Sequence, residues 1–359
     1  SGGGKSSGTR LVIWEQMDPE ERPRFEANLA AFKAARPGVE IEHLPFETEQ
    51  LRTQYQTAVS GGSTTPDLVF GPSDQGGPLS LLKTIRALDE TMPAGFFDRF
   101  IPGSLDTLAG HVWAIPDQVG NHLVLVYNRK LVPEAPQDAA SFLAAAKRLT
   151  KAGSRGQPGS YGFAMNLSEP YWLVPFLGGF GGWVMDAGHQ PTLDTPAMVQ
   201  ALAYLRDLKG KQGVMPVESD YMGAETLFKE GRAAMIVNGP WSWSGYRKAG
   251  IDLGVAPIFQ LPNGAWAQPM VASKGYSINV NVPKEKLALV IELVTYLTSP
   301  EAQMRQATEL GILPSHRDAY AGATIASDPT LRASQDAGER GRRMPVVPEM
   351  RVIWDVMRP

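Results

Sequence analysis

The 359-residue sequence contains no cysteine and only five histidines. It also lacks an apolar run of the ~20 residues that a membrane-spanning helix needs. Without cysteine the chain can form no disulfide, no thiolate nucleophile and no zinc or iron–sulfur site built on sulfur ligands. The histidines are scattered singly, so we expect each to be structural or exposed, and we expect no metal site and no cofactor.

Charge and motif content exclude further classes of protein. The formal net charge is −3 and no basic tract occurs, so we expect no nucleic-acid partner. The sequence has no phosphate-binding glycine loop, dinucleotide fingerprint, Ser–His–Asp pattern or HExxH motif. No residue pattern therefore favours catalysis, and we predict that the protein is not an enzyme.

The composition, 43% hydrophobic and 20% charged, is that of a globular protein, in a chain longer than one core usually organises. Short apolar runs such as 11–14 alternate with helical patterns, which predicts an α/β fold with mainly parallel sheets. Asp18 is placed to cap the first helix, with Pro19 at its first position. The segment 116–121 reads as a polar connection between strands, and 321–340 as irregular structure.

The segment GRAAMIVNGPWSWSGY, residues 231–246, predicts a strand followed by a turn and a helix. Its apolar run 234–237 is typical of a strand covered on both faces, and Pro240 suits the first position of a helix. Ligands bind at such turns in open α/β sheets. We interpret Trp241 as a site residue, because an indole suits a sugar ring, and Trp243 as a core residue.

A second strand-to-helix junction carries Glu169-Pro170-Tyr171-Trp172. Carboxylates accept hydrogen bonds from sugar hydroxyls, and aromatic rings stack on the apolar faces of the sugar. Asp18 is interpreted equally well as a helix cap, and Trp354 as a core residue. A pair of carboxylates could also be the acid and base of a glycosidase. The candidate functional residues are Asp18, Asp74, Glu169, Tyr171, Trp241 and Trp354.

Several motifs together resemble the maltose/maltodextrin-binding proteins, which are the solute-binding components of sugar ABC transporters. The resemblance runs in order from Leu11 to Arg358. It is carried by LVIWE near the N-terminus, YNRKLVP, NLSEPYW with GGFGGWVMD, MIVNGPWSWS, and MPVVPEMRVIW near the C-terminus.

The resemblance implies a two-lobe, periplasmic-binding-protein-like α/β fold with a hinge and a ligand cleft between the lobes. Lobe 1 is expected in 10–118 and 273–312, and lobe 2 in 124–266 and 315–359. The hinge crossings are expected in 119–123 and 267–272. The implied partners are a sugar and the membrane permease of an ABC transporter, and we expect a monomer at the periplasmic or extracellular face.

The family's site residues carry over by position. Glu169 and Tyr171 match residues that bond and stack the sugar, and Trp241 and Trp354 match stacking aromatics. Asp74 and, more loosely, Asp18 match carboxylates that hold hydroxyls. Met344 and Arg358 match positions with smaller contributions, and we add Trp172, beside Tyr171, as a further candidate.

This sequence departs from the family pattern at three places. The family's Trp-Ala-x-Asp-Arg loop is here Gly71-Pro72-Ser73-Asp74-Gln75, so one stacking ring and one arginine are missing. Pro19 replaces a lysine, and the acidic residue of the inter-lobe segment is absent near Gly120-Asn121. Two compensations are open: Gln118, Asn121 and His122 could supply new hydrogen bonds, or a differently shaped disaccharide such as trehalose could fill the space.

We therefore expect the protein to capture an α-glucoside, which is maltose, trehalose or a short maltodextrin. The alternatives left open are a glycoside-hydrolysing enzyme and a sugar sensor or scaffold domain. Residues 1–9 read as a flexible linker like that of a lipoprotein whose acylated cysteine is missing. The sequence stops at Pro359, within what the resemblance implies are the last helices of lobe 2. We therefore expect a domain that is either truncated or continued into a fused partner.

Overall fold

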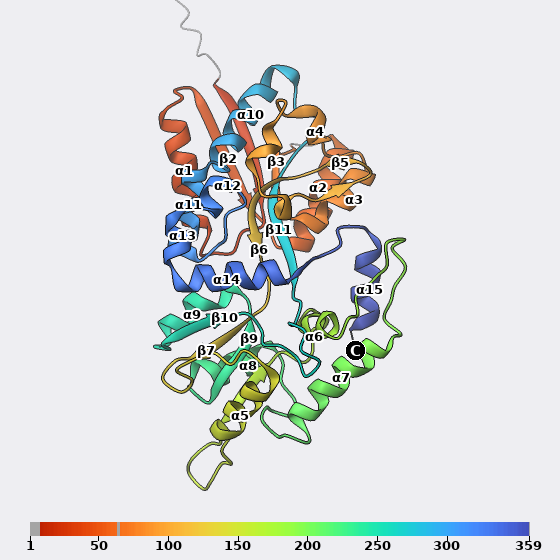
Figure 1. The fold of residues 1–359 in the computed structure, drawn as a ribbon. Coiled ribbons are helices and arrows are strands. Elements are labelled where there is room, and N and C mark those ends of the chain that lie inside the picture. The colour runs from red at the N-terminus through yellow and green to blue at the C-terminus, as the bar shows by residue number, and fades with distance from the viewer. Residues whose placement is uncertain (1–7, 63–64, 359) are drawn as a thin grey trace, which may run out of the picture. The chain divides into compact units, whose positions relative to one another are not determined.

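The computed structural model describes residues 8–62 and 65–358, and shows a chain that folds into two compact units (Figure 1). Unit 1 contains the described residues up to Val119, together with Ala272–Ile325 and Pro345–Pro348. Unit 2 contains Gly120–Val271, Ala326–Met344 and the described residues from Glu349 onward. Most of the predicted N-terminal linker, residues 1–7, lies outside the described residues.

In unit 1 the sheet has the strand order β11-β3-β1-β2, and β6 pairs with β11. The first two residues of β11, Met270 and Val271, belong to unit 2 and pair there with β12 (Arg342–Arg343). Strands β1, β2 and β3 are parallel, and β11 runs antiparallel to β3. The carboxyl ends of β1 and β3 therefore lie at the same edge of the sheet. The elements of unit 1 are β1 (Thr9–Glu15), α1 (Arg22–Ala34), β2 (Val39–Pro45), α2 (Thr48–Gly61), β3 (Leu68–Pro72), η1 (Ser73–Gln75), α3 (Gly76–Leu81), α4 (Leu88–Thr91), η2 (Phe96–Arg99), η3 (Pro102–Ser104), β4 (Thr107–Leu108), β5 (His111–Val112), β6 (Ile115–Gly120), β11 (Met270–Ile278), α10 (Lys284–Leu297), α11 (Pro300–Leu310), α12 (Arg317–Tyr320) and α13 (Ala323–Ser327).

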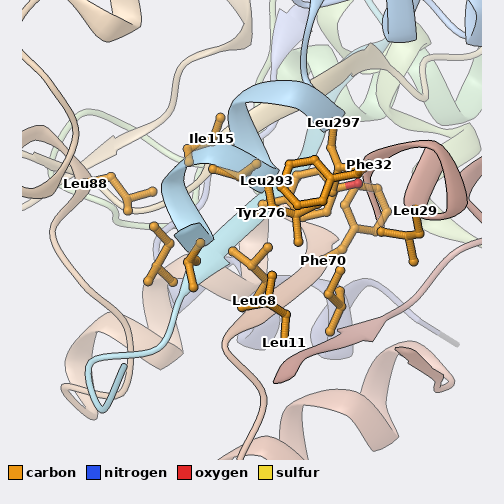
Figure 2. Packing of buried hydrophobic residues seen from close by; sticks show 14 of the residues in the cluster. Leu11, Leu29, Phe32, Leu68, Phe70, Leu88, Ile115, Tyr276, Leu293 and Leu297 are labelled. Carbon is orange, nitrogen blue, oxygen red and sulfur yellow. The ribbon is translucent and has the colours of Figure 1, made fainter. Parts of the chain in front are cut away.

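The core of unit 1 forms where helices α1 and α10 pack against the sheet. Figure 2 shows Phe70 of β3, Tyr276 of β11 and Phe32 of α1 meeting side chains from α10 such as Leu293 and Leu297. The rings of Phe70 and Tyr276, on paired strands, lie 4.9 Å apart. This core thus joins segments that are more than 200 residues apart in the sequence.

The sheet of unit 2 has the order β10-β7-β9-β8. Strands β8 and β9 are parallel, whereas β7 is antiparallel to both β9 and β10. The predicted parallel pattern therefore holds only in part, since the pair β8 and β9 is parallel and the two pairs that β7 forms are antiparallel. The elements of unit 2 are β7 (Val124–Asn128), α5 (Ala139–Leu149), β8 (Tyr161–Met165), η4 (Pro170–Trp172), α6 (Val174–Gly179), α7 (Pro196–Lys209), α8 (Tyr221–Lys229), β9 (Ala233–Asn238), η5 (Pro240–Ser242), α9 (Trp243–Lys248), β10 (Leu253–Ala256), α14 (Pro329–Arg340), β12 (Arg342–Arg343) and α15 (Glu349–Met357).

Strand β9 and the elements after it follow the prediction for 231–246 closely. Every residue of β9 is buried, as expected for a strand covered on both faces. Gly231 has a φ of 73°, the left-handed value that favours glycine after a helix. Trp243 is 1% exposed and belongs to the core of unit 2, which confirms the interpretation of this residue.

Two predictions about helices are wrong. Helix α1 begins at Arg22 and not at Pro19, and Asp18 does not cap it. Asp18 lies instead in a turn, where its backbone N–H donates to the Glu21 carboxylate. The segment 321–340 is largely helical, because Asp328 caps α14 and buried side chains of α14 pack it onto unit 2.

The connection predicted for 116–121 is strand β6 for most of its length, since it pairs with β11. The third crossing of the chain between the units lies at 325/326, beyond the predicted 312–315. Backbone hydrogen bonds explain this difference: Val119 N–H donates to Leu313, and Ile101 N–H donates to Ser315, which holds these residues in unit 1. None of the described helices has the length and apolarity needed to cross a membrane.

We predict that Trp243→Ala lowers the free energy of unfolding by roughly 3 kcal/mol or more, because it leaves a cavity in the core of unit 2. Urea unfolding followed by circular dichroism measures this change. Val199→Ala is the matched control, since Val199 is 66% exposed on α7. A loss no larger than that of the control would contradict the assignment of Trp243 to the core.

Candidate functional site

Two short turns at the end of neighbouring strands build the candidate site of unit 2. Strands β8 and β9 are parallel and adjacent, so their carboxyl ends lie at one edge of the sheet. The turn η4 follows β8 and carries Tyr171 and Trp172, and the turn η5 follows β9 and carries Trp241. Both turns begin with proline, which presets the backbone angle of the first helical residue. The strand pairing is what brings these aromatic residues together.

Five aromatic side chains of unit 2 form a continuous group, which we call the aromatic row: Trp354, Tyr171, Trp172, Tyr221 and Trp241. Tyr171 lies 6.2 Å from Trp354 and 5.7 Å from Trp172 between ring centroids. Trp172 in turn lies 6.4 Å from Trp241 and 5.9 Å from Tyr221. The rings meet edge-on or tilted, which is a favourable geometry for aromatic pairs.

The polar edges of the rings at the centre of the row are bonded to the protein backbone. Trp172 donates its Nε1–H to the carbonyl of Val237, the residue before the end of β9, at 2.9 Å. Tyr171 donates its hydroxyl to the carbonyl of Asn121. A tyrosine hydroxyl is protonated at neutral pH, and burial raises the pKa of Tyr171 further. These bonds fix the orientation of both rings.

The ring of Trp241 lies against Gly239 of its own backbone turn. A Cβ atom added to Gly239 would come within 1.9 Å of the Trp241 ring, so only glycine leaves room for the indole at this position. The ring is only partly buried, and its Nε1–H donates to the Tyr221 hydroxyl at 2.9 Å. The turn Asn238-Gly239-Pro240 therefore determines where this ring lies.

Glu169 and Arg358 add charge beside the row. Arg358 Nε lies 3.3 Å from Glu169 Oε2, and both side chains are about half exposed. Glu169 also lines a groove of about 600 Å³ with residues of β8, α7 and the end of α15. The structure thus brings Glu169, Tyr171, Trp172, Trp241, Trp354 and Arg358 together within unit 2.

The predicted carboxylates of unit 1 lie after neighbouring parallel strands. Asp18 follows β1, and Asp74 lies in η1 directly after β3. Both side chains are exposed. Carboxyl ends of adjacent parallel strands meet at one sheet edge, so these residues occupy the region of unit 1 where ligands bind in such folds.

The loop that carries Asp74 contains Gly71 and Gln75, the two positions where this sequence lacks the family's tryptophan and arginine. Gln75 is 8% exposed, and its Oε1 lies 2.5 Å from where a Cβ of Gly71 would be. The Gln75 side chain therefore folds over Gly71 and fills the space above it. A larger residue at position 71 would have to displace Gln75.

The remaining candidates contribute no side chain to the aromatic row, and only Asn121 contacts it, through its backbone carbonyl. In unit 1, Gln118 Nε2 donates to Glu21 at 2.9 Å. In unit 2, His122 is fully buried with its Nε2 2.7 Å from the Ser334 carbonyl, and burial lowers its pKa to about 4. This histidine is a neutral core residue and does not face a ligand. The Asn121 carbonyl binds Tyr171, and the Met344 backbone N–H donates to Val271.

Two aromatic residues were not among the sequence-based candidates. Tyr221 belongs to the aromatic row, but it is the first residue of α8, and no motif marks it. Trp113 of unit 1 packs beside Gly76, close in sequence to Asp74, and donates its Nε1–H to the Leu108 carbonyl. Tertiary packing brings Tyr221 to the candidate Trp241, and Trp113 to the loop that carries the candidate Asp74.

One group of described residues has the composition of a metal site: Asp89, Glu90 and His111 of unit 1. His111 Nδ1 lies 2.9 Å from Asp89 Oδ2, and a hydrogen bond to Asp89 raises the pKa of His111. Asp89 also accepts the backbone N–H of Val112. An ion pair on the surface accounts for this arrangement.

Comparison with known proteins identifies the family. The profile of the bacterial extracellular solute-binding proteins matches residues 27–333. The chain belongs to this family. The predicted family resemblance and the two-lobe α/β fold class are therefore confirmed.

Three similar proteins illustrate the relationship. The maltose/maltodextrin-binding domain of Bdellovibrio bacteriovorus, solved with bound maltotriose, is 36% identical, with a TM-score of 0.85 over 97% of this chain and 91% of that one. The maltotriose-binding protein of Pyrococcus abyssi is 26% identical over 96% of this chain and 75% of its own length. A maltooligosaccharide ABC transporter solute-binding lipoprotein of Streptococcus pneumoniae is 25% identical over 81% of this chain and 69% of its own length.

A buried carboxylate lies next to Gln118 on β6. Asp117 is 1% exposed, and neither of its oxygens has a hydrogen-bond partner of good geometry among the described residues. Burial raises the pKa of Asp117 to about 7, and the nearby charge of Glu21 adds to the rise. The unfolded chain has the ordinary value of 3.8, so the folded protein loses stability as the pH rises from about 4 through 7.

We predict that Asp117→Asn stabilises the protein at pH 8 by roughly 2–4 kcal/mol, because the amide removes a charge that the fold does not solvate. The difference from the wild type should shrink as the pH falls to 4.5, where the wild-type carboxyl is neutral. Thermal unfolding at pH 4.5, 6 and 8 measures it, with Asp194→Asn, on the surface of unit 2, as the control. A pH-independent difference would contradict the raised pKa.

Proposed function

We propose that this protein captures an α-glucoside and delivers it to the membrane permease of an ABC transporter, at the outer face of the membrane. The aromatic row of unit 2, with Glu169 beside it, is the observation that carries the proposal. Maltose, trehalose and short maltodextrins are the expected ligands.

The chemistry of the row supports a sugar ligand. A glucose unit has apolar C–H faces and a polar rim of hydroxyls, and aromatic faces stack on the former. Tyr171 uses its polar edge on the backbone, so what it offers a ligand is apolar ring surface. Trp172 is buried and supports this ring and that of Trp241 from behind. Glu169 and Arg358 supply an acceptor and donors for hydroxyl groups in the same unit.

The relatives support the same ligand class and the same partner. One is named for maltotriose, another for maltooligosaccharides and an ABC transporter, and the similar solved domain holds maltotriose. No relative named here supports trehalose. It is among the expected ligands because Gly71 and Gln75 replace the ring and the arginine of the family loop, which favours a sugar of a different shape. Since Gln75 covers Gly71, we expect this part of unit 1 to contribute little stacking.

The test is calorimetric titration with maltose, trehalose, maltotriose and glucose. We expect heat of binding with one or more of the α-glucosides. An amino acid, a peptide or a metal ion that binds in place of every sugar would overturn the proposal. Incubation with the same sugars separates binding from hydrolysis, because release of glucose that disappears in Glu169→Gln would make the protein a glycosidase.

We predict that Trp241→Ala and Trp354→Ala each weaken sugar binding by about 1–3 kcal/mol, because each removes one stacking face. The same titrations measure the loss. Trp266→Ala is the control, because Trp266 of unit 2 lies outside the aromatic row, with Arg340 over its ring. Equal losses in all three variants would show that the row has no special part in binding.

The predicted lobes and hinge remain a proposal that rests on the family. We expect residues 119–123 and 267–272 to act as hinge segments and the protein to close on its ligand. Small-angle scattering with and without saturating maltotriose should then show a smaller radius of gyration for the bound protein. Superimposable curves from a sample shown to bind the sugar would rule out the closure.

A further inference from the structure

The indole of Trp241 is held at its polar edge by a residue that no sequence motif marks. Trp241 Nε1 lies 2.9 Å from the hydroxyl oxygen of Tyr221, at the start of α8. The ring of Tyr221 also packs edge-on against Trp172, with centroids 5.9 Å apart. Tyr221 therefore contacts two of the three indoles of the row, those of Trp172 and Trp241.

The Tyr221 hydroxyl is in turn fixed by a buried carboxylate. Its oxygen lies 3.0 Å from Oε1 of Glu225, which is 8% exposed, and a carboxylate can only accept a hydrogen bond. Lys229 Nζ lies 3.0 Å from the other oxygen of Glu225 and balances its charge. Tyr221, Glu225 and Lys229 stand on one face of α8, at i, i+4 and i+8.

This arrangement uses the full capacity of the Tyr221 hydroxyl. A phenol has one hydrogen to donate and two lone pairs that accept. The hydrogen goes to Glu225, one lone pair accepts from Trp241, and Asn238 Nδ2 is a second donor to the hydroxyl oxygen, at 3.5 Å. No donor or strong acceptor position is left for a sugar hydroxyl.

We infer that Tyr221 is a positioning residue: through its hydroxyl it sets the orientation of the Trp241 indole and so the affinity for an α-glucoside. The inference rests on the proposed function. The indole is only partly buried and lies over Gly239, which has no side chain to hold it. The bond to Tyr221 is therefore the polar contact that selects one orientation of the ring.

The test removes the hydroxyl and keeps the ring. We expect Tyr221→Phe to weaken maltotriose binding about tenfold, the effect of one hydrogen bond. Tyr204→Phe is the matched control, since Tyr204 is a largely buried tyrosine of α7 that packs on Phe176 and Phe180 outside the aromatic row. Its affinity for maltotriose should equal that of the wild type.

A double-mutant cycle separates positioning from direct contact with the sugar. Trp241→Phe removes the N–H that Tyr221 holds, so adding Tyr221→Phe in that background should change the affinity no further. The indole N–H signal of Trp241 in a nitrogen–proton NMR spectrum, assigned by its loss in Trp241→Phe, should move in Tyr221→Phe and stay in Tyr204→Phe. This readout needs no sugar and shows that the variant is folded.

The outcomes are distinct. An unchanged affinity in Tyr221→Phe, or an unmoved indole signal, would overturn the inference. A tenfold loss that persists in the Trp241→Phe background would also overturn it, because Tyr221 would then act without Trp241. If the wild-type protein bound no sugar while the indole signal moved, the proposed function would fail, and the role in affinity with it.

Discussion

The carboxyl end of β9 is the constraint on which the candidate site depends. The strand is buried along its whole length, and its last residues bind three neighbouring elements. The Val237 carbonyl accepts the Trp172 indole, and Asn238 Nδ2 donates to Tyr246 of α9 at 2.7 Å. Asn238 Oδ1 also accepts the backbone N–H of Gly239. The strand end therefore fixes η4, α9 and the turn that carries Trp241.

This constraint also holds the rings of the aromatic row in one arrangement. Rings that are held only by packing can tilt, whereas Trp172, Tyr171 and Trp241 are each tied by a hydrogen bond at the polar edge. Such preorganisation lowers the entropy cost of binding. The core beneath them, with Trp243 and Tyr246, supports the same turn from inside. Binding surface and core are thus parts of one structure.

The two units use the same rule of α/β folds with different side chains. Unit 1 places exposed carboxylates, Asp18 and Asp74, after parallel strands, and unit 2 places aromatic rings after parallel strands. Each unit therefore has its own kind of group at its strand ends, hydrogen-bond acceptors in unit 1 and aromatic rings in unit 2. Membership of an extracellular solute-binding family agrees with a binding role.

The sequence alone determined the fold class, the buried strand β9, the turn at Asn238-Gly239-Pro240 and the opposite roles expected for Trp241 and Trp243. These features follow from local patterns of apolar residues, glycine and proline, which act over a few residues. The sequence misplaced the start of α1 and the state of 321–340, because partners distant in the chain decide them.

Only the tertiary structure decided the composition of the site. It buried His122 against α14 and brought Tyr221 to Trp241, and no local pattern encodes either contact. Their physical cause is the packing of helices on sheets, which joins residues from 20 to more than 200 positions apart.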